Sequence, residues 1–361
     1  MYRDLTRGPI ARSLVLFALP MMAGNLLQQF YNIADTLIVG RALGTDALAA
    51  VGSAYTLMTF LTSILLGLSM GSGALFSIYR GRGDEASLRS AIAHAFGLIL
   101  LLTLALNAAV YAFLNPILHF LRVPAAVWGG MREYLLVVFA GLVATSVYNY
   151  LACLLRALGN SAAPLVFLGV SALLNVGLDL LFVPVLGWEI AGAAWATVIA
   201  QYVSAAGMLV YVLAKCKILL PKRSELHLNR SILGEIFRLS SLTCAQQSVM
   251  NFGILMVQGL VNSFGATVMA AFAAAVKIDT FAYLPVQDFG NAYSTFAAQN
   301  FGAKRTDRIR EGTRRAFLLS AGFGASLSIA VCALAAPLMR LFVDPGETAV
   351  VTAGVRYLGI E

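Results

Sequence analysis

Long apolar stretches, separated by short polar segments, recur along the whole chain. Stretches of ~18 or more apolar residues can cross the hydrocarbon core of a bilayer as a helix. Strands of a membrane barrel would instead show short segments of alternating polarity. The pattern therefore predicts ten membrane-spanning helices: 13–40, 47–79, 90–114, 127–155, 161–184, 190–214, 236–263, 266–298, 313–336 and one starting near 348.

Composition strengthens this interpretation. Of the 361 residues, 60% are apolar and only 12% are charged, against roughly 25% charged in an ordinary soluble domain. So few charges cannot cover the surface of a soluble protein of this size. Residues 1–12 are polar and basic, and the apolar run that follows is too long for the core of a signal peptide. We therefore expect an all-α, multi-pass membrane protein.

The distribution of basic residues predicts its orientation. With the amino terminus in the cytoplasm, 19 Lys and Arg residues lie on the inner side of the predicted spans and 4 on the outer side. This asymmetry follows the positive-inside rule. The net charge of +8 is thus explained as an orientation signal, and no nucleic-acid partner is expected.

The second half of the sequence repeats the first at an offset of 221 residues. The segment LGTDALAAV (43–51) aligns with FGATVMAAF (264–272), and Gly81 aligns with Gly302. Six spans per half would give two six-helix lobes as a parallel repeat about an axis along the membrane normal. We predict an amino-terminal lobe at 1–214, a basic cytoplasmic linker at 215–235 and a carboxyl-terminal lobe at 236–361. The last contains about three helices and the start of a fourth, so the second lobe is expected to be incomplete here.

Ionisable residues within the predicted spans are candidates for function, because each costs about 2.5–3.5 kcal/mol at mid-membrane. Asp35 and Asp179 each lie five residues before the outer end of a span, and Thr197 lies seven residues after the outer start of another. At 1.5 Å per residue, all three lie about 8–10 Å below the outer face. Asn175 shares a helix face with Asp179 through its i, i+4 spacing.

Two carboxylates, an amide and a hydroxyl at one depth suit a hard cation such as sodium. They equally suit a proton, because two neighbouring carboxylates cannot both stay ionised without cost. The alternative is that Asp35 and Asp179 each satisfy a helix end near the interface. A shared site also requires the first and fifth spans to be in contact, which depth alone does not establish.

The second half contains no copy of Asp35, since Met256 stands at the equivalent position. It has instead Lys277, Asp279 and Asp288 in its second span, which we interpret as lining a water-filled cavity. Aromatic residues within the spans, such as Phe30 and Tyr31, are interpreted as packing residues.

No enzyme activity or cofactor is predicted. The chain lacks a G-x-x-x-x-G-K-[ST] phosphate-binding loop, its polar segments are too short for a catalytic domain, and its His and Cys residues are isolated. An ion gradient is then the expected energy source for any transport.

The order of several motifs resembles the multidrug and toxic compound extrusion family over essentially the whole chain. The segments that carry the resemblance are LALPMMAGNLLQQFYNIADTLIVGRALG, LRALGNSAAPLVF, LLNVGLDLLFV, GWEIAGAAWATVIAQ and FAAQNFGAKRTDRIREG.

The resemblance implies a secondary antiporter that works by alternating access between two lobes. It would export amphiphilic, often cationic, compounds against an inward flow of sodium or protons. It also implies a cation site at Asp35, Asn175, Asp179 and Thr197. A tyrosine that the family carries at the start of the fourth span would fall on Tyr134, which we expect to line the cavity. Some members carry an acid in the seventh span, whereas this chain has Gln246, Gln247 and Asn251 there, so we expect these three to line a cavity.

Two alternative functions were weighed. A lipid or lipid-linked oligosaccharide flippase of related architecture would line its cavity with several basic residues, whereas only Lys277 is clearly intramembrane here. A non-transporting membrane subunit would not need the paired acids. The favoured hypothesis is a monomeric exporter in a bacterial inner membrane, in contact with lipid and a small amphiphilic substrate. The choice between sodium and proton is left open.

Overall fold

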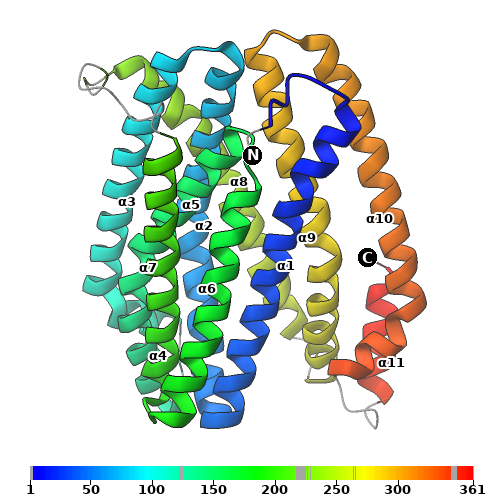
Figure 1. Cartoon of the computed structure of the whole chain (residues 1–361). Helices are drawn as coiled ribbons and strands as arrows, with labels where there is room; N and C mark the ends of the chain where they lie inside the picture. The colour runs from blue at the N-terminus through cyan, green and yellow to red at the C-terminus, as the bar shows by residue number, and fades with distance from the viewer. Residues whose placement is uncertain are drawn as a thin grey trace.

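The structure is a computed structural model that describes residues 3–360 except 122, 124, 217–224, 226, 228, 263, 265 and 343–347. Within these residues it is a bundle of long helices joined by short turns, without a β-strand (Figure 1). The predicted all-α membrane fold is confirmed. In chain order the helices are α1 (Ile10–Leu43), α2 (Thr45–Arg82), α3 (Glu85–Phe120), α4 (Ala125–Val138), α5 (Leu142–Ala157), α6 (Ala162–Leu180), α7 (Glu189–Lys215), α8 (Arg230–Asn262), α9 (Ala266–Gly302), α10 (Thr306–Phe342) and α11 (Thr348–Leu358).

Each predicted span corresponds to one of these helices, with the fourth span divided into α4 and α5. Within the described residues, seven helical segments are long and apolar enough to cross a membrane. Large apolar side chains on their outer faces are open to the surroundings, for example Leu173 at 78% and Val166 at 60% exposure. A bilayer is the environment that accommodates such surfaces.

The helix boundaries repeat along the chain. A shift of 221 residues moves α1, α2 and α3 to 231–264, 266–303 and 306–341, close to the observed bounds of α8, α9 and α10. The contacts repeat as well. A Cβ atom on Gly81 would lie 1.9 Å from the Gln299 carbonyl oxygen, and one on Gly302 would lie 2.0 Å from the Ile78 carbonyl oxygen. Residues 78 and 81 occupy the places that 299 and 302 occupy one repeat later, so α2 and α9 meet in a reciprocal contact, as a two-fold axis requires.

An irregular turn divides the fourth predicted span. A 3₁₀ turn at Phe139–Gly141 separates α4 from α5, and side chains from neighbouring helices bind its carbonyl groups. The Asn107 Nδ2 atom donates to the Phe139 carbonyl at 3.1 Å, and the Tyr202 hydroxyl donates to the Ala140 carbonyl at 2.9 Å. Such partners are needed where backbone groups are released within a membrane.

Helix α1 occupies the position on which the site depends. It packs along α6 on one side and along α9 on the other, as Figure 1 shows for the blue helix. The contact between the first and fifth predicted spans, which the sequence alone did not establish, is therefore present.

Parts of the sequence-based prediction lie outside the described residues. Lys217, Lys222 and Arg223 of the predicted linker, and Arg122, were counted in the charge asymmetry and are among them. The described Glu225 of the linker is bound by Arg89 of α3, whose Nη2 donates to Oε1 at 2.7 Å. This ion pair is largely shielded, with side-chain exposures of 11% and 14%.

Candidate functional site

Three helices bring the four predicted cation-site residues together. Asp35 is on α1, Asn175 and Asp179 are on α6, and Thr197 is on α7. The three residues on α6 and α7 are buried, with Asp179 at 0% exposure, while Asp35 is half-buried. A polar group that is excluded from water must be hydrogen-bonded or must bind an ion to offset the cost of burial.

The Asn175 amide links α6 to α7. When its nitrogen faces Asp179, it donates to the Asp179 Oδ2 atom at 3.1 Å. Its oxygen then accepts hydrogen bonds from the Thr197 hydroxyl and backbone N–H, at 3.3 Å each. In this orientation every donor faces an acceptor, and Asp179 is held by a neighbour on its own helix.

The carboxyl groups of Asp35 on α1 and Asp179 on α6 lie close enough to interact with each other. Two neighbouring carboxyl groups cannot both stay ionised without cost. The Oδ1 atoms of Asp35 and Asp179 are buried and have no hydrogen-bond partner among the described residues. These two oxygen atoms are acceptors able to bind a proton or a metal cation.

The chain changes its helical geometry directly after Asp179. Residues Leu181–Val185 form a π-helical turn that contains Pro184. Proline has no N–H to donate and its ring crowds the preceding turn, so the helix widens here. Turns of this kind interrupt regular helices frequently at functional sites, and this one ends α6 beside the acidic pair.

Two tyrosines complete the surroundings of the carboxyl groups. Tyr134 of α4 is 5% exposed and lies close enough to interact with Asp35, Asp179 and Thr197; its role in lining a cavity stays a prediction. Tyr31 of α1 lies close enough to interact electrostatically with both Asp35 and Asp179. Sequence reasoning assigned Tyr31 to packing. Its spacing of four residues from Asp35 was the available signal, because residues four apart share a helix face.

The residues predicted to line a cavity in the second half are distributed over α8 and α9. The side chains of Gln246 and Lys277 are exposed, whereas Gln247, Asn251 and Asp279 are half-buried. The Asn251 amide donates to the Gln247 carbonyl at 2.9 Å within α8. A cavity lined by these five residues stays a prediction.

Asp288 is different, and its predicted place on a water-filled cavity is wrong for this structure. Its side chain is 2% exposed. The Asn25 Nδ2 atom of α1 donates to both carboxylate oxygens, at 2.7 and 2.8 Å, and Arg156 of α5 is near enough to interact electrostatically. Asp288 therefore joins α9 to helices of the first half, and the amide hydrogen bonds offset part of the cost of burying it.

Comparison with known proteins identifies relatives over nearly the whole chain. The MatE family model matches residues 20–181 and 242–360. The "Probable multidrug resistance protein YpnP" of Bacillus subtilis is 30% identical over 98% of this chain and 79% of its own length. The "Probable multidrug resistance protein NorM" of Thermotoga maritima is 24% identical over 97% of this chain and 76% of its own length.

Solved structures show the same fold. One, described as the "Outward-facing conformation of a multidrug resistance MATE family transporter of the MOP superfamily", has a TM-score of 0.92 at 20% identity. It covers 98% of this chain and 79% of its own. A MOP superfamily transporter from Pyrococcus furiosus has a TM-score of 0.89 at 21% identity, with the same coverage.

Proposed function

The chain belongs to the MatE family of multidrug and toxic compound extrusion transporters, and on that premise we propose that it exports amphiphilic, often cationic, compounds by antiport against sodium or protons. Members of the family are transporters rather than enzymes. Several relatives are named as multidrug resistance or multidrug export proteins, which supports drug-like compounds as the substrate class.

The observation that carries the coupling proposal is the proximity of Asp35 and Asp179, whose buried Oδ1 atoms have no hydrogen-bond partner among the described residues. A buried acidic pair that holds one proton can release it when a second cation arrives or when water reaches the pair. Asn175 and Thr197 supply the further oxygen atoms that a sodium ion would need. Both ions therefore suit the same four residues, and the pair changes its net charge in either case.

The position of Asp35 gives the cation an entrance. Asp35 is half-buried while Asp179 is fully buried, so a cation reaches the pair from the Asp35 side. Tyr31 and Tyr134 enclose the carboxyl groups and can donate hydrogen bonds to them when they are ionised. In the proposed cycle, cation binding and substrate binding favour different arrangements of the two halves, which is how an ion gradient drives export.

The proposal includes a location. The protein would be a monomer in a bacterial inner membrane, with its amino terminus in the cytoplasm and its outer helix faces in contact with lipid. The charge asymmetry of the sequence supports this orientation, and the exposed apolar side chains support the lipid contact.

The test uses purified protein in lipid vesicles loaded with a fluorescent amphiphilic cation. We expect an inward sodium gradient or an inward proton gradient, imposed in separate experiments, to drive export from the compartment equivalent to the cytoplasm. The gradient that works identifies the coupling ion. Vesicles in which neither gradient changes the rate of dye movement, relative to vesicles without protein, would contradict the proposal. A lipid-scrambling assay on the same vesicles tests the flippase alternative.

A further inference from the structure

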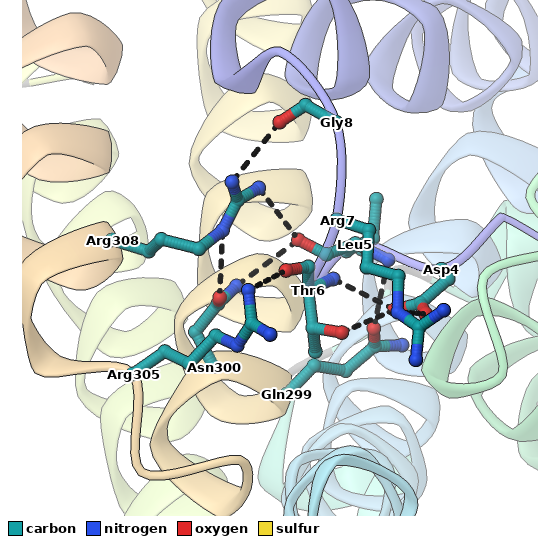
Figure 2. Close-up of polar contacts among 9 residues, drawn as sticks. All are labelled: Asp4, Leu5, Thr6, Arg7, Gly8, Gln299, Asn300, Arg305 and Arg308. Carbon is teal, nitrogen blue, oxygen red and sulfur yellow. Dashed lines mark hydrogen bonds and ion pairs between the residues drawn. The ribbon is translucent and has the colours of Figure 1, made fainter.

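The first described residues of the chain run across the end of the bundle that we predict to be cytoplasmic. Residues Arg3–Gly8, called the strap below, precede α1 and lie against the turn between α9 and α10 (Figure 2). Leu5 is 0% exposed although it lies outside any helix, so its backbone polar groups need partners within the protein.

Side chains of the second half bind both backbone polar groups of Leu5, the N–H and the carbonyl. The Leu5 N–H donates to the Gln299 Oε1 atom at 3.3 Å. The Leu5 carbonyl accepts from the Asn300 Nδ2 atom at 3.2 Å and from the Arg308 Nη2 atom at 3.4 Å. Gln299 and Asn300 are 2% and 0% exposed, so these bonds are made away from water, where unpaired groups are costly.

Two arginines of the second half bind further carbonyl groups of the strap. The Arg305 Nη1 atom donates to the Thr6 carbonyl at 3.1 Å, and the Arg308 Nη1 atom donates to the Gly8 carbonyl at 3.0 Å. The Arg308 Nε atom also donates to the Asn300 Oδ1 atom at 3.2 Å. The Arg308 guanidinium thus binds the carbonyls of Leu5 and Gly8. It also binds the side chain of Asn300, which itself donates to the Leu5 carbonyl, as Figure 2 shows.

The same strap is attached to the first half. The Arg3 N–H donates to the Gly159 carbonyl at 3.0 Å, in the turn between α5 and α6. Gly159 has a φ of +87°, and a Cβ atom there would lie 2.0 Å from the Arg3 carbonyl oxygen. Gln299 makes a second connection, because its Nε2 atom donates to the Ala157 carbonyl at 2.7 Å.

These contacts join the two halves of the protein at the end of the bundle that we predict to be cytoplasmic. If α9 moved away from α2 and α5 at this end, the hydrogen bond from Gln299 to the Ala157 carbonyl would break. The strap could then stay bound to only one half, through Gly159 or through Asn300. Several buried donors and acceptors would be released together, so the closed arrangement is stabilised as a unit.

We propose that the strap is a latch that must release Gln299, Asn300 and Arg308 before the predicted cytoplasmic end can open. These three residues are then positioning residues of transport, since they set the equilibrium between the two open states without touching the cation. The proposal rests on the alternating-access function proposed above.

The test measures the distance across this end directly. Spin labels are attached to cysteines at Ala86 and Thr306, which are exposed, in a variant whose four native cysteines are replaced by alanine. Arg308→Gln should raise the ratio of long to short distances about tenfold, equivalent to about 1.4 kcal/mol. Arg310→Gln is the matched control, because it removes the same charge two residues further along α10 from an exposed side chain. Equal distance distributions in both variants and the parent would overturn the proposal.

A second experiment does not depend on weakening the structure. In the variant Arg7→Cys/Thr306→Cys, a short cleavable cross-linker joins the strap to α10. We expect transport to fall at least about tenfold on linking and to recover on cleavage, and an unchanged rate in the linked protein would contradict the latch. The distance measurement requires no transport, so a failed latch and a failed exporter function give different results. If the latch proposal fails, the parent transports the dye and the variants have the same distances as the parent. If the exporter proposal fails, the distances change in Arg308→Gln but no gradient moves the dye.

Discussion

At the scale of single residues, three intramembrane acids, Asp35, Asp179 and Asp288, each lie against a particular polar partner. Asp179 meets Asn175 and Asp35, whereas Asp288 meets Asn25. An ionisable side chain in the membrane costs about 2.5–3.5 kcal/mol, and these partners offset it in different ways. Asp35 and Asp179 lie close together and have unused oxygen atoms, which suits the binding of a proton or a metal cation. Asp288 has both oxygens occupied by one amide, so we assign it to the joining of the halves.

Thr197 provides a test of the cation site that leaves both acids in place. Thr197→Val keeps the shape of the side chain but removes the hydroxyl that donates to the Asn175 oxygen. The Asn175 oxygen would keep only the Thr197 backbone N–H, and a bound cation would lose one oxygen ligand. The cation concentration for half-maximal transport should therefore rise roughly tenfold, equivalent to about 1.4 kcal/mol. The measurement is the rate of dye export as a function of the concentration of the coupling cation.

The matched control is Thr352→Val on α11, where an exposed hydroxyl donates to the Thr348 carbonyl at 2.8 Å. This variant should keep the parent concentration dependence. If Thr197→Val also keeps it while its expression and unfolding temperature stay at parent values, Thr197 does not contribute to cation binding.

The sequence predicted the members of the cation cluster but not the surroundings of every acid. Depth within the membrane is encoded by residue counts along each span, so Asp35, Asp179 and Thr197 could be placed at one level. The partner of Asp288 could not be found this way, because Asn25 lies 263 residues away in the chain and the pairing depends on how two remote helices pack. Tyr31 was assigned to packing because an aromatic residue in a membrane helix is usually apolar in its role.

At the scale of helices, the close approach of α2 and α9 makes a sharp prediction at Gly81. Gly81→Ala would place a methyl group 1.9 Å from the Gln299 carbonyl oxygen, which forces the two helices apart. Overpacking of this kind typically costs about 1–3 kcal/mol. We expect a lower unfolding temperature in detergent, and in the spin-label experiment a larger population of long distances.

Gly97→Ala on α3 is the control for that substitution. No atom lies within 4 Å of a Cβ placed on Gly97, and alanine favours a helix by about 1 kcal/mol over glycine. Its unfolding temperature should match or exceed that of the parent. A Gly81→Ala variant as stable as Gly97→Ala would show that the helices are not in tight contact at this point.

The start of α3 gives a prediction of pH dependence outside the membrane. The Asp84 side chain accepts a hydrogen bond from the Ser87 N–H at 3.0 Å and caps the helix. Hydrogen bonds from Ser87 lower the pKa of Asp84 below its ordinary value of 3.8. Because the pKa is lower in the folded state, the stabilisation is complete above the unfolded pKa and is lost as the pH falls through the folded pKa.

Asp84→Ala should therefore lower the free energy of unfolding by about 1 kcal/mol at neutral pH, and the difference from the parent should shrink in acid. Thermal unfolding at neutral pH and below the ordinary pKa of the group measures both effects. Asp84→Asn keeps an oxygen that can cap the helix, so it should retain most of the stability. Equal destabilisation by Asn and Ala would show that the cap contributes nothing.

Helices were the part of the fold that the sequence predicted best. Long apolar runs specify each span, and all ten predicted spans are helical in the structure. The irregular turns that interrupt the helices were harder to predict from the sequence. Pro184 indicated an end to α6, but neither the π-helical turn after Asp179 nor the 3₁₀ turn at Phe139–Gly141 follows from apolar periodicity. The 3₁₀ turn is bound by side chains of neighbouring helices, and the π-helical turn depends on the backbone geometry at Pro184.

At the scale of the whole molecule, α1 connects the cation cluster to the seam between the halves. Asn25 and Asp35 lie ten residues apart on this helix, which corresponds to about 15 Å along its axis. Between them, the Phe30 ring contacts the Phe281 ring of α9 at a centroid distance of 5.6 Å. In the proposed function, a change of charge at Asp35 would act on the same helix that holds Asp288 through Asn25, and would in this way bias the arrangement of the halves.

The most direct test of the central claim is uphill accumulation of a fluorescent amphiphilic cation in vesicles under an imposed gradient of the coupling ion. The comparison is between the parent protein and the double variant Asp35→Asn/Asp179→Asn, reconstituted at equal amounts. The account predicts accumulation above equilibrium by the parent alone, with the variant limited to the equilibrium level. Gradient-driven accumulation by the double variant at the parent rate would contradict it.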